Sequence, residues 1–368
     1  MPSRLTRRSF LARAAAASAS LVVSAGSAAR DPAYAGPPTR QPRWGAVRRA
    51  GSAQQTRRTE LTFTQYHNQT AESSLHTRLS EMWTAISKET NGRVEARVFP
   101  LNNNVAGSDP AALKMLVAGE IQFFTLMGGV LGAAVPVAEI QQVPFAFTTA
   151  PHAHQVVDGP LGAYIREEMA AKGIHGFPVG AFDNGMRQMT PVSRPIVVPA
   201  DLNGLRMRVP AGQMFDDMFR TLGCQPVTIN SIDIYAALKS GKADAQENPL
   251  ALVDSFKLYE VIKYVSMTNH MWSGFNQMAH LPTWQRLPAD IKQVIERNVT
   301  RAVRLQREDQ EAANGRLRAE LTKRGLIFND VDQAPFRRQL SGFYKTWKGR
   351  LGTKAWSLLE QAAGSTLA

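Results

Sequence analysis

Four polar residues near the middle of the chain have the types and positions that suit anion binding. Arg187 lies in a turn motif after an expected strand, and Asn248 closes a later loop. Arg206 and Arg208 share one face of a short strand that ends at Pro210. The planar fork of an arginine gives a carboxylate two parallel hydrogen bonds, and open α/β sheets place ligands at strand ends. These segments predict a carboxylate site, although each arginine taken alone is more often part of a structural ion pair.

The sequence carries none of the common catalytic signatures. It has no G-x-S-x-G, H-E-x-x-H or C-x-x-C motif and no phosphate-binding glycine loop. His152 and His154 are spaced so that they would share a metal only from a strand or a loop, whereas they open an amphipathic stretch. The sequence therefore predicts no catalytic residue, no metal ligand and no cofactor.

The N-terminal residues have the order of an export signal. Residues 6–11 read T-R-R-S-F-L, residues 14–25 are rich in Ala, Ser and Val, and the small residues Ala33 and Ala35 precede Gly36. This order predicts a twin-arginine signal peptide over residues 1–35 and a mature protein in the periplasm. A chance arginine pair in a disordered segment is the alternative. Residues 36–59 are rich in Pro, Gly and Arg without an apolar period, which predicts a disordered basic linker.

The formal charge of +13 belongs mostly to these first 59 residues. They hold 11 of the 43 basic and one of the 30 acidic residues, which leaves 32 basic against 29 acidic residues, a net of +3, from residue 60 on. The folded part therefore lacks the basic footprint of a nucleic-acid-binding protein. The apolar run of the signal is too short to span a bilayer, so we expect no stable membrane insertion of the mature protein. Cys224 is the only cysteine, so it has no disulfide partner.

Strand and helix patterns alternate from residue 60 onward. Apolar patterns predict strands over residues 61–65, 92–100, 121–127, 204–209 and 225–229, and helices over residues 75–89, 111–119, 213–222 and 232–239. This alternation indicates a parallel or mixed sheet flanked by helices and repeated in two lobes. Residues 289–324 predict a long charged helix across both lobes, broken only at residues 313–315, and residues 336–359 predict a packing helix.

Many of these segments together resemble the DctP-type solute receptors of tripartite ATP-independent periplasmic (TRAP) transporters. The agreement runs in family order from about residue 61 to 290. The matching segments are residues 90–94, 99–100, 143–147, 152–159, 184–188, 201–210, 235–238, 246–249, 259–264 and 268–270. The resemblance also indicates that His152 and His154 lie on a helix.

The resemblance implies a two-lobed α/β fold like that of periplasmic binding proteins, with a hinge and a long helix crossing both lobes. Lobe I would comprise residues 60–184 completed by 275–313, and lobe II residues 185–274 completed by 314–368. In such receptors the arginine of the R-V-P strand, here Arg208, is the main carboxylate clamp. Arg187 and Asn248 commonly assist it, and Asp109 lies where some members bind ligand hydroxyls.

The resemblance also implies further residues of the cleft wall. Tyr66, His67, Met127 and Gly128 lie on stretches that face the cleft in relatives, and Phe215, Trp272 and Phe275 are further candidates whose alternative role is core or hinge packing. Receptors of the sialic-acid branch carry Glu where this chain has Met127 and an aromatic residue where it has Ser231. We therefore expect a mono- or dicarboxylate with an apolar or aromatic portion rather than a polyhydroxylated sugar acid.

The expected function is that of an extracytoplasmic receptor that delivers a small organic acid to the small and large membrane subunits of a TRAP transporter. We expect a monomer without catalytic activity. A receptor that feeds a sensor kinase would have the same cleft. A periplasmic enzyme acting on an organic acid is the remaining alternative, and it would need a nucleophile or metal set that the sequence does not display.

Overall fold

The computed structural model describes residues 59–364, 366 and 367. The expected signal peptide, residues 1–35, and the expected linker up to residue 58 lie outside the described residues. Within the described residues, none of the helices combines the length and the apolar character that crossing a membrane requires.

One nine-stranded mixed sheet organises the described residues. Eight strands follow the order β2-β1-β3-β8-β4-β7-β5-β6, and the ninth strand, β9, pairs with β8 outside this path. Its first half contains β1 (Leu61–His67), which pairs in parallel with β2 (Val94–Phe99) and with β3 (Phe123–Met127). Its second half contains β5 (Arg206–Val209), which pairs in parallel with β6 (Gln225–Thr228) and with β7 (Ala245–Asn248). The expectation of a mixed sheet in two α/β units is confirmed.

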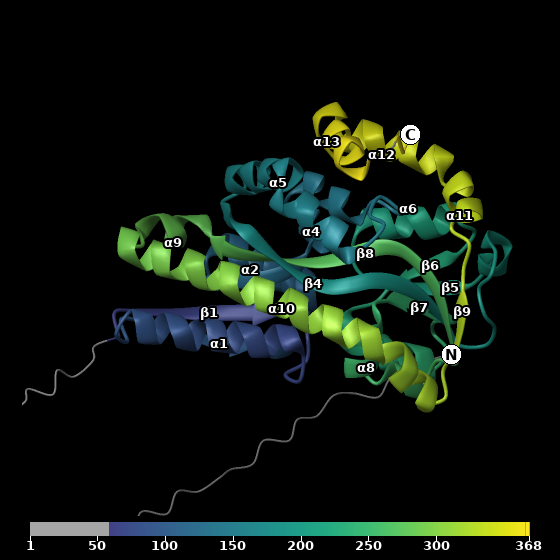
Figure 1. Ribbon diagram of the computed structural model, residues 1–368, viewed down its shortest axis with the longest axis horizontal. Helices are drawn as coiled ribbons and strands as arrows, with labels where there is room; N and C mark the ends of the chain where they lie inside the picture. The colour runs from purple at the N-terminus through teal and green to yellow at the C-terminus, as the bar shows by residue number, and fades with distance from the viewer. Residues whose placement is uncertain (1–58, 365, 368) are drawn as a thin grey trace, which may run out of the picture. The chain divides into compact units, whose positions relative to one another are not determined.

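Two long antiparallel strands, β4 (Ile174–Pro191) and β8 (Tyr264–His280), join the two halves (Figure 1). β8 pairs with β3 in the first half, and β4 pairs with β7 in the second. The register between β4 and β8 shifts at three places, and the middle one, between Asp183 and Gly185, is about midway along both strands. Such an irregularity bends the strands locally, and here it lies between the part of β8 that pairs with β3 and the part of β4 that pairs with β7.

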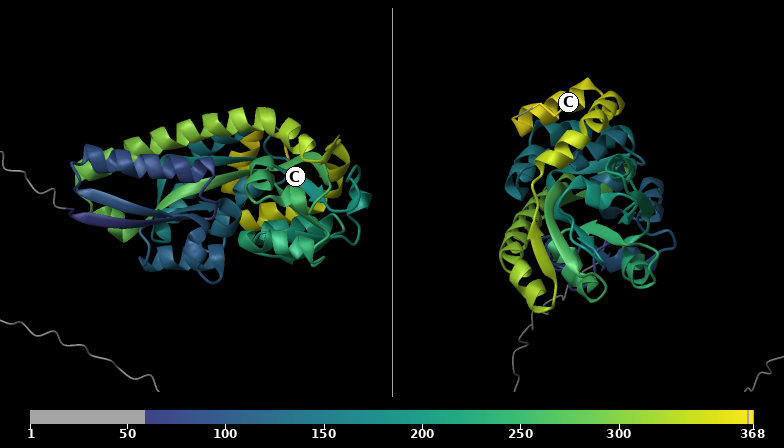
Figure 2. Two further views of the ribbon diagram at one scale, coloured as in Figure 1. Left: turned by 90° about the horizontal axis from the view of Figure 1, so that it is seen from below. Right: turned by 90° about the vertical axis from the view of Figure 1, so that its right-hand side faces the viewer.

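Helices cover both halves of the sheet (Figure 1 and Figure 2). The helices are α1 (Ser74–Glu89), α2 (Ser108–Ala118), α3 (Gly128–Leu131), α4 (Ala150–Asp158), α5 (Pro160–Ala171), α6 (Gln213–Thr221), α7 (Ile234–Lys239), α8 (Leu250–Ser255), α9 (Leu281–Arg286), α10 (Ala289–Lys323), α11 (Ala334–Gln339), α12 (Ser341–Leu351) and α13 (Thr353–Ala363). Short 3-10 turns are η1 (Pro100–Asn104), η2 (Pro136–Gln142), η3 (Pro199–Leu202), η4 (Ser231–Asp233) and η5 (Leu258–Glu260), and the last strand is β9 (Ile327–Asp330).

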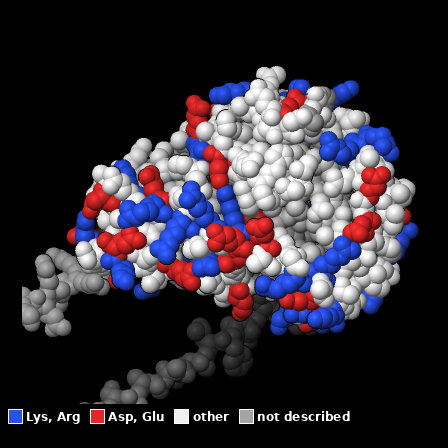
Figure 3. Space-filling model, viewed as in Figure 1, with Lys and Arg blue, Asp and Glu red and all other residues white. Residues whose placement is uncertain are grey.

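The long helix α10 spans both halves, because it contacts α1 of the first and α8 of the second as well as β4. Its buried residues recur at helical spacing, from Ile291 to Leu321. Its outer face carries charges of both signs, since Glu296, Arg297 and Arg301 are exposed. Figure 3 shows acidic and basic side chains interspersed on this side of the molecule. This mixture is what the near-balanced charge of the folded part predicts for a solvated helix face.

Two expectations about the C-terminal half are corrected. The break predicted at residues 313–315 does not occur, and α10 is continuous through it. Asn314 accepts a hydrogen bond from Gln310 one turn earlier, and Leu317 and Leu321 beyond it are buried, so packing on both sides outweighs the low helix propensity of Asn and Gly. The single helix expected over residues 336–359 is instead α11, α12 and α13, separated near Leu340 and at Gly352.

The contacts of α13 bear on the lobe boundaries. α13 packs against α5 and η2, which precede β4 in the chain and fall within expected lobe I, whereas α12 contacts α6 of expected lobe II. The C-terminal helices thus touch both lobes, and the boundaries given above stay a prediction.

Candidate functional site

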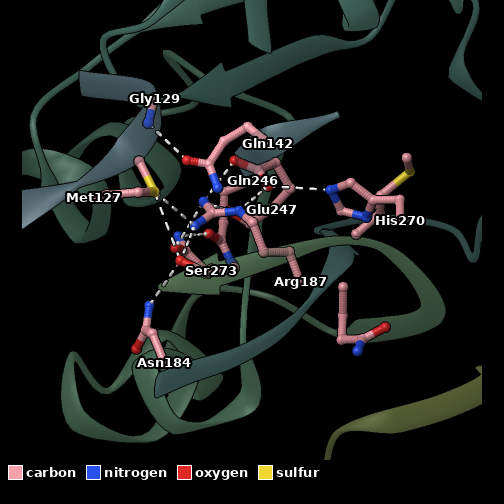
Figure 4. A network of polar contacts seen from close by, with 12 residues as sticks. Met127, Gly129, Gln142, Asn184, Arg187, Gln246, Glu247, His270 and Ser273 are labelled. Carbon is pink, nitrogen blue, oxygen red and sulfur yellow. Dashed lines mark hydrogen bonds and ion pairs between the residues drawn. The ribbon is translucent and has the colours of Figure 1, made fainter. Parts of the chain in front are cut away.

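Arg187 lies at the centre of a buried polar network (Figure 4). Its Nε and Nη2 atoms donate to the two carboxylate oxygens of Glu247 at 2.5 and 2.7 Å, and Nη2 also donates to Oδ1 of Asn248 at 3.0 Å. Nη1 donates to Ser273 Oγ at 3.1 Å and lies 3.6 Å from the sulfur of Met127. Arg187 is only 2% exposed. Its fork is therefore already occupied by a protein carboxylate.

His270 completes this ion pair. Its Nε2 atom lies 3.2 Å from Oε2 of Glu247, and its Nδ1 atom lies 2.8 Å from the hydroxyl of Thr268. Burial lowers the pKa of His270 against the opposing effect of Glu247, so Nε2–H donates to the carboxylate and Nδ1 accepts from Thr268. Burial alone would raise the pKa of Glu247, but Arg187 and His270 hold it below its ordinary value. Glu247 is therefore ionised, and its negative charge balances the positive charge of Arg187.

Arg208, on β5, differs from Arg187 in its partners. Its Nε and Nη2 atoms both donate to the backbone carbonyl of Ile229, at 2.9 and 2.6 Å. Among the residues that the structure describes, no carboxylate lies within ion-pair distance of Arg208. Arg208 is 2% exposed. Burial lowers its pKa to about 9, so the guanidinium remains charged at neutral pH and lacks a direct counter-ion.

Asp109, at the start of α2, is the acid from the first half of the sheet that faces Arg208. Its two oxygens accept from Asn68 Nδ2 at 2.9 Å and Asn102 Nδ2 at 2.5 Å. Burial raises the pKa of Asp109, while the two amides and the charge of Arg208 lower it. The charge of Arg208, from the second half of the sheet, therefore acts on an acid of the first half, although no ion pair joins the two side chains.

A cavity of about 470 Å³ lies between α1, α8 and α10, and Arg187, Arg208 and Asp109 are not among its lining residues. Gln69, Asn184 and Phe275 are among its lining residues. Gln69 donates to Asn68, the partner of Asp109, and Asn184 donates to Ser273, the partner of Arg187. Two short hydrogen-bond chains therefore connect this cavity to the polar groups of both halves.

The structure brings together Arg187, Asn248, Met127 and Phe215 of the expected site residues. The ring centroid of Phe215 lies 5.2 Å from the guanidinium carbon of Arg187. The sulfur of Met127 lies 3.6 Å from Nη1 of Arg187 and 3.6 Å from Oγ of Ser273. Gly128 is buried against η2, where an added Cβ would lie 2.8 Å from the carbonyl oxygen of Ala138. Ser231 follows Ile229 by two residues, and its buried hydroxyl has no hydrogen-bond partner among the described residues.

The other expected residues lie at the margin. Tyr66 packs edge-on against Phe99 and its hydroxyl accepts from Asn103. Nε2 of His67 lies 2.9 Å from Nδ1 of His76, and burial lowers the pKa of His67 to about 3. The indole of Trp272 donates to Asp183, which lies at the register shift midway along β4. These three side chains have structural partners, and their role in binding stays a prediction.

The resemblance indicated that His152 and His154 lie on a helix, and the structure agrees. His152 and His154 lie on α4, where Nε2 of His152 is 2.9 Å from the carbonyl oxygen of Ala362 and His154 stands next to Asp183. Among the described residues there is no group of three or more His, Cys, Asp or Glu side chains placed to hold a metal ion.

Three polar residues of the network were missed by the sequence reasoning: Glu247, His270 and Ser273. Glu247 lies within the matching segment 246–249 and His270 within 268–270, so the sequence analysis had identified both segments but assigned neither residue a role. The sequence offered little signal for Glu247, because β7 reads Ala-Gln-Glu-Asn and only the structure shows that all four residues are buried. A carboxylate is almost never fully buried without a partner. Pairing it with Arg187, 60 residues away, requires the β4–β7 register.

The helix that carries Phe215 begins at a buried acid. Oε2 of Glu139, on η2, accepts from the backbone N–H of Met214 in the first turn of α6, at 2.8 Å. Glu139 is 8% exposed. Burial raises its pKa from 4.5 to about 7, with a smaller contribution from Asp217 and an opposing one from Arg350. This acid therefore titrates near neutral pH.

The raised pKa of Glu139 predicts a pH-dependent stability. The folded protein binds this proton more tightly than the unfolded chain, so the stabilisation is complete below the unfolded pKa of 4.5 and is lost as the pH rises through about 7. We expect Glu139→Gln, which keeps an acceptor for Met214, to exceed the native protein in stability at pH 8.5 by roughly 2–3 kcal/mol. Denaturant unfolding at pH 5.5 and 8.5 measures this difference. The exposed Glu95→Gln is the control, and equal pH profiles for Glu139→Gln and the native protein would contradict the assignment.

Comparison with known proteins decides the family to which this arrangement belongs. The model of the bacterial extracellular solute-binding proteins, family 7, known as DctP, matches residues 66–349. The chain belongs to this family. Its members are solute-binding receptors, and the two-lobed fold expected from the sequence is the family fold.

Individual relatives agree with the family model. A solute-binding protein of Roseobacter denitrificans is 30% identical over 278 residues, which cover 76% of this chain and 84% of the relative. A protein of Sinorhizobium fredii is 36% identical over 209 residues, which cover 57% of this chain and only 38% of that longer relative. The crystal structure of a TRAP periplasmic solute-binding protein from Roseobacter denitrificans, with bound L-galactonate, has a TM-score of 0.76 and 26% identity, and the match covers 83% of this chain and 99% of that one.

Proposed function

We propose that this DctP-family protein is the solute receptor of a TRAP transporter and binds a small organic acid between its two lobes. The observation that supports this most directly is Arg208, a charged guanidinium that is buried without a carboxylate partner. Burying an unpaired charge is costly, and a ligand carboxylate would remove that cost through two charge-assisted hydrogen bonds.

The ligand would act by stabilising the closed arrangement of the lobes. Arg208 belongs to the second half of the sheet, and Asp109 and Asn68 belong to the first. A ligand that contacts both sides binds the closed form better than an open one, and so it shifts the population toward closure. The hinge in this proposal is the irregular part of β4 and β8 around Asp183 and Gly185, where the register shifts.

The roles of the two arginines differ in this proposal. Arg208 takes the carboxylate, whereas Arg187 is held by Glu247 and orients Asn248. The expectation of an apolar portion in the ligand rested partly on aromatic residues near the site. Two of them have partners within the protein, since the ring of Phe215 packs on Arg187 and the indole of Trp272 donates to Asp183. Several relatives hold bound sugar acids, such as L-galactonate and D-glucuronate, and one has density assigned as pantoate. The expectation against a sugar acid therefore stays untested for this chain.

The remaining features of the proposal come from the family, apart from the export route, which comes from the order of residues 6–36. A receptor performs no turnover, and it serves the small and large membrane subunits outside the cytoplasm after twin-arginine export. Adjacent genes for one small and one large multispanning membrane protein would support transport. A neighbouring gene for a sensor kinase with an extracytoplasmic domain would instead favour the signalling alternative.

A thermal-shift screen tests the binding function. We expect at least one acid from a panel of aliphatic, aromatic, hydroxylated and sugar acids to raise the melting temperature, since a ligand at 100 times its Kd adds about 2.7 kcal/mol. The neutral amide of the same acid is the control and should leave the melting temperature unchanged. A panel in which no acid stabilises the protein, or in which the amide does so equally, would contradict the proposal. Chromatographic recovery of the unchanged acid after incubation separates a receptor from an enzyme.

A further inference from the structure

The loop between β1 and α1 is tied to the fold by two histidines. His67, the last residue of β1, has no exposed surface, and His76 lies in the first turn of α1 and is half-buried. The backbone N–H of Gln69 donates to Nδ1 of His67 at 3.3 Å, and Nε2 of His67 lies 2.9 Å from Nδ1 of His76. A chain of two hydrogen bonds therefore runs from the loop through His67 to the helix.

The backbone decides which atoms donate and accept in this chain. A backbone N–H can only donate, so Nδ1 of His67 is an acceptor and the proton of its neutral ring is on Nε2. Nε2–H of His67 therefore donates to Nδ1 of His76, which carries no proton. Burial lowers the pKa of both rings, and for His67 it does so to about 3, so both are neutral at neutral pH.

This arrangement has no place for a proton on Nδ1 of His76. With a proton there, two N–H donors would face each other across the contact with His67. His67 can restore the contact only by losing its Nε2 proton to water and taking one at Nδ1, so that Nε2 accepts from His76. Nδ1–H of His67 then faces the backbone N–H of Gln69, and that hydrogen bond is lost.

Few charges act on His76. Glu72, in the loop before α1, is exposed and raises the pKa of His76 against the larger, opposite effect of burial. β1 carries no charged residue apart from His67. The charged side chains of the first half of α1, of β2 and of the part of α10 next to α1 are exposed or paired with each other, namely Arg78, Glu81, Glu95, Arg97, Asp309 and Arg316.

Gln69 connects the histidine pair to residues of the first half that take part in the proposed binding. Its side chain donates to Oδ1 of Asn68 at 3.0 Å, and Nδ2 of Asn68 donates to Asp109 at 2.9 Å. Its backbone carbonyl accepts from the N–H of Leu101 at 3.0 Å, and its side chain lines the cavity of about 470 Å³. Loss of the bond from Gln69 to His67 would therefore loosen the support of Asn68 and Asp109.

We propose that protonation of His76 reverses the tautomer of His67, releases the loop at Gln69 and so weakens binding of the acid at acidic pH. The inference rests on the proposed function and adds a pH-sensitive release to it. The acid-bound form needs the loop in place, whereas the free form tolerates its release, so bound acid and neutral His76 favour each other. In the released loop His76 has its ordinary pKa of 6.5. The contribution to affinity is therefore complete above this pH and is lost progressively as the pH falls below it.

Calorimetry at two pH values tests this inference. The purified protein is titrated at pH 7.5 and 5.5 with D-glucuronate, with L-galactonate and with the acid that raises its melting temperature most. We expect the Kd of the tightest-binding acid to be about tenfold higher at pH 5.5, the effect of losing one buried hydrogen bond. Carboxylic acids remain ionised at both pH values, so the change is a property of the protein.

A variant of His76 and a matched control assign the effect. His76→Asn cannot be protonated, and its Oδ1 replaces Nδ1 as an acceptor for His67, so the ratio of the two Kd values should fall to within about threefold. His280 is another half-buried histidine, and its Nδ1 lies 2.9 Å from the hydroxyl of Thr283. His280→Asn should keep the full ratio.

The tautomer of His67 gives a second readout that needs neither the His76 variant nor an acid. Nitrogen NMR spectra of the histidine-labelled protein, assigned with His67→Gln, distinguish Nδ1–H from Nε2–H. We expect Nε2–H at pH 7.5 and Nδ1–H once His76 is protonated. Nε2–H throughout the titration, equal Kd values at the two pH values, or a full ratio in His76→Asn overturns the inference and leaves the receptor function intact. A protein that binds none of the acids contradicts the proposed function, and this inference with it.

Discussion

Replacing Arg208 with alanine should weaken binding of the acid by roughly 2–5 kcal/mol, which corresponds to roughly 30-fold to several thousandfold in Kd. The reason is that the described structure holds no other free cation next to Asp109 that could receive the carboxylate. The side chain bonds only the backbone carbonyl of Ile229, so its loss removes a desolvated charge without breaking an ion pair. Calorimetry measures the affinity, and the melting temperature of the ligand-free protein should change by only a few degrees.

The matched control for this prediction lies two residues earlier. Arg206 is on the same strand, but its side chain is 45% exposed and pairs with Asp244 at the surface. Arg206→Ala should leave the affinity within about twofold, because exposed ion pairs contribute little. Equal affinities for the Arg208→Ala variant and the native protein would show that the carboxylate binds elsewhere.

Replacing Glu247 with glutamine should destabilise the fold itself. The change leaves the charge of Arg187 buried without its counter-ion, which costs about 3–5 kcal/mol. For a protein of this size that loss lowers the melting temperature by roughly 10 °C. His270 adds to the effect, since its Nε2–H would then donate to an amide rather than to a carboxylate. Thermal unfolding of the ligand-free protein measures the difference.

A double replacement identifies the ion pair as the cause. Arg187→Met combined with Glu247→Gln should cost less than the sum of the two single changes, by about 1–3 kcal/mol, because no unpaired charge remains. Arg316→Met is the matched surface control, since its pair with Glu320 is 62% and 42% exposed, and it should shift the stability by less than about 0.5 kcal/mol. Strict additivity of the Arg187 and Glu247 changes would contradict the assigned pairing.

The enclosure of the two arginines was not expected from the sequence. Burying an unpaired charge is costly, so a ligand-free cleft in which Arg208 contacts water would be expected, whereas both arginines are 2% exposed. For Arg187 the reason is its pairing with Glu247, which no spacing in the sequence revealed. For Arg208, the carbonyl of Ile229 and the charges of Glu247 and, to a smaller extent, Asp109 offset part of the cost of burial.

Periodic patterns predicted the regular elements because burial of one face leaves a direct trace in the order of residues. α1 is an example, with a Ser73 cap and the buried residues Leu75, Leu79, Met82 and Trp83 on one face. The same reasoning failed at residues 313–315 and at Gly352. Whether Gly interrupts a helix depends on the packing of the turns before and after it, which the local sequence does not contain.

The amino-acid order by itself determined the α/β class, the family, and the chemical type of the binding groups. Arg187, Arg208, Asp109 and Asn248 are recognisable because a guanidinium, a carboxylate and an amide keep their chemistry in any fold. Only the tertiary structure decided which arginine is free. Glu247 comes from a different strand, and the register of β4 against β7 places it on Arg187 rather than on Arg208. Pairing between distant strands depends on the whole sheet. The different roles of Arg187 and Arg208, which have identical side chains, therefore follow from the fold.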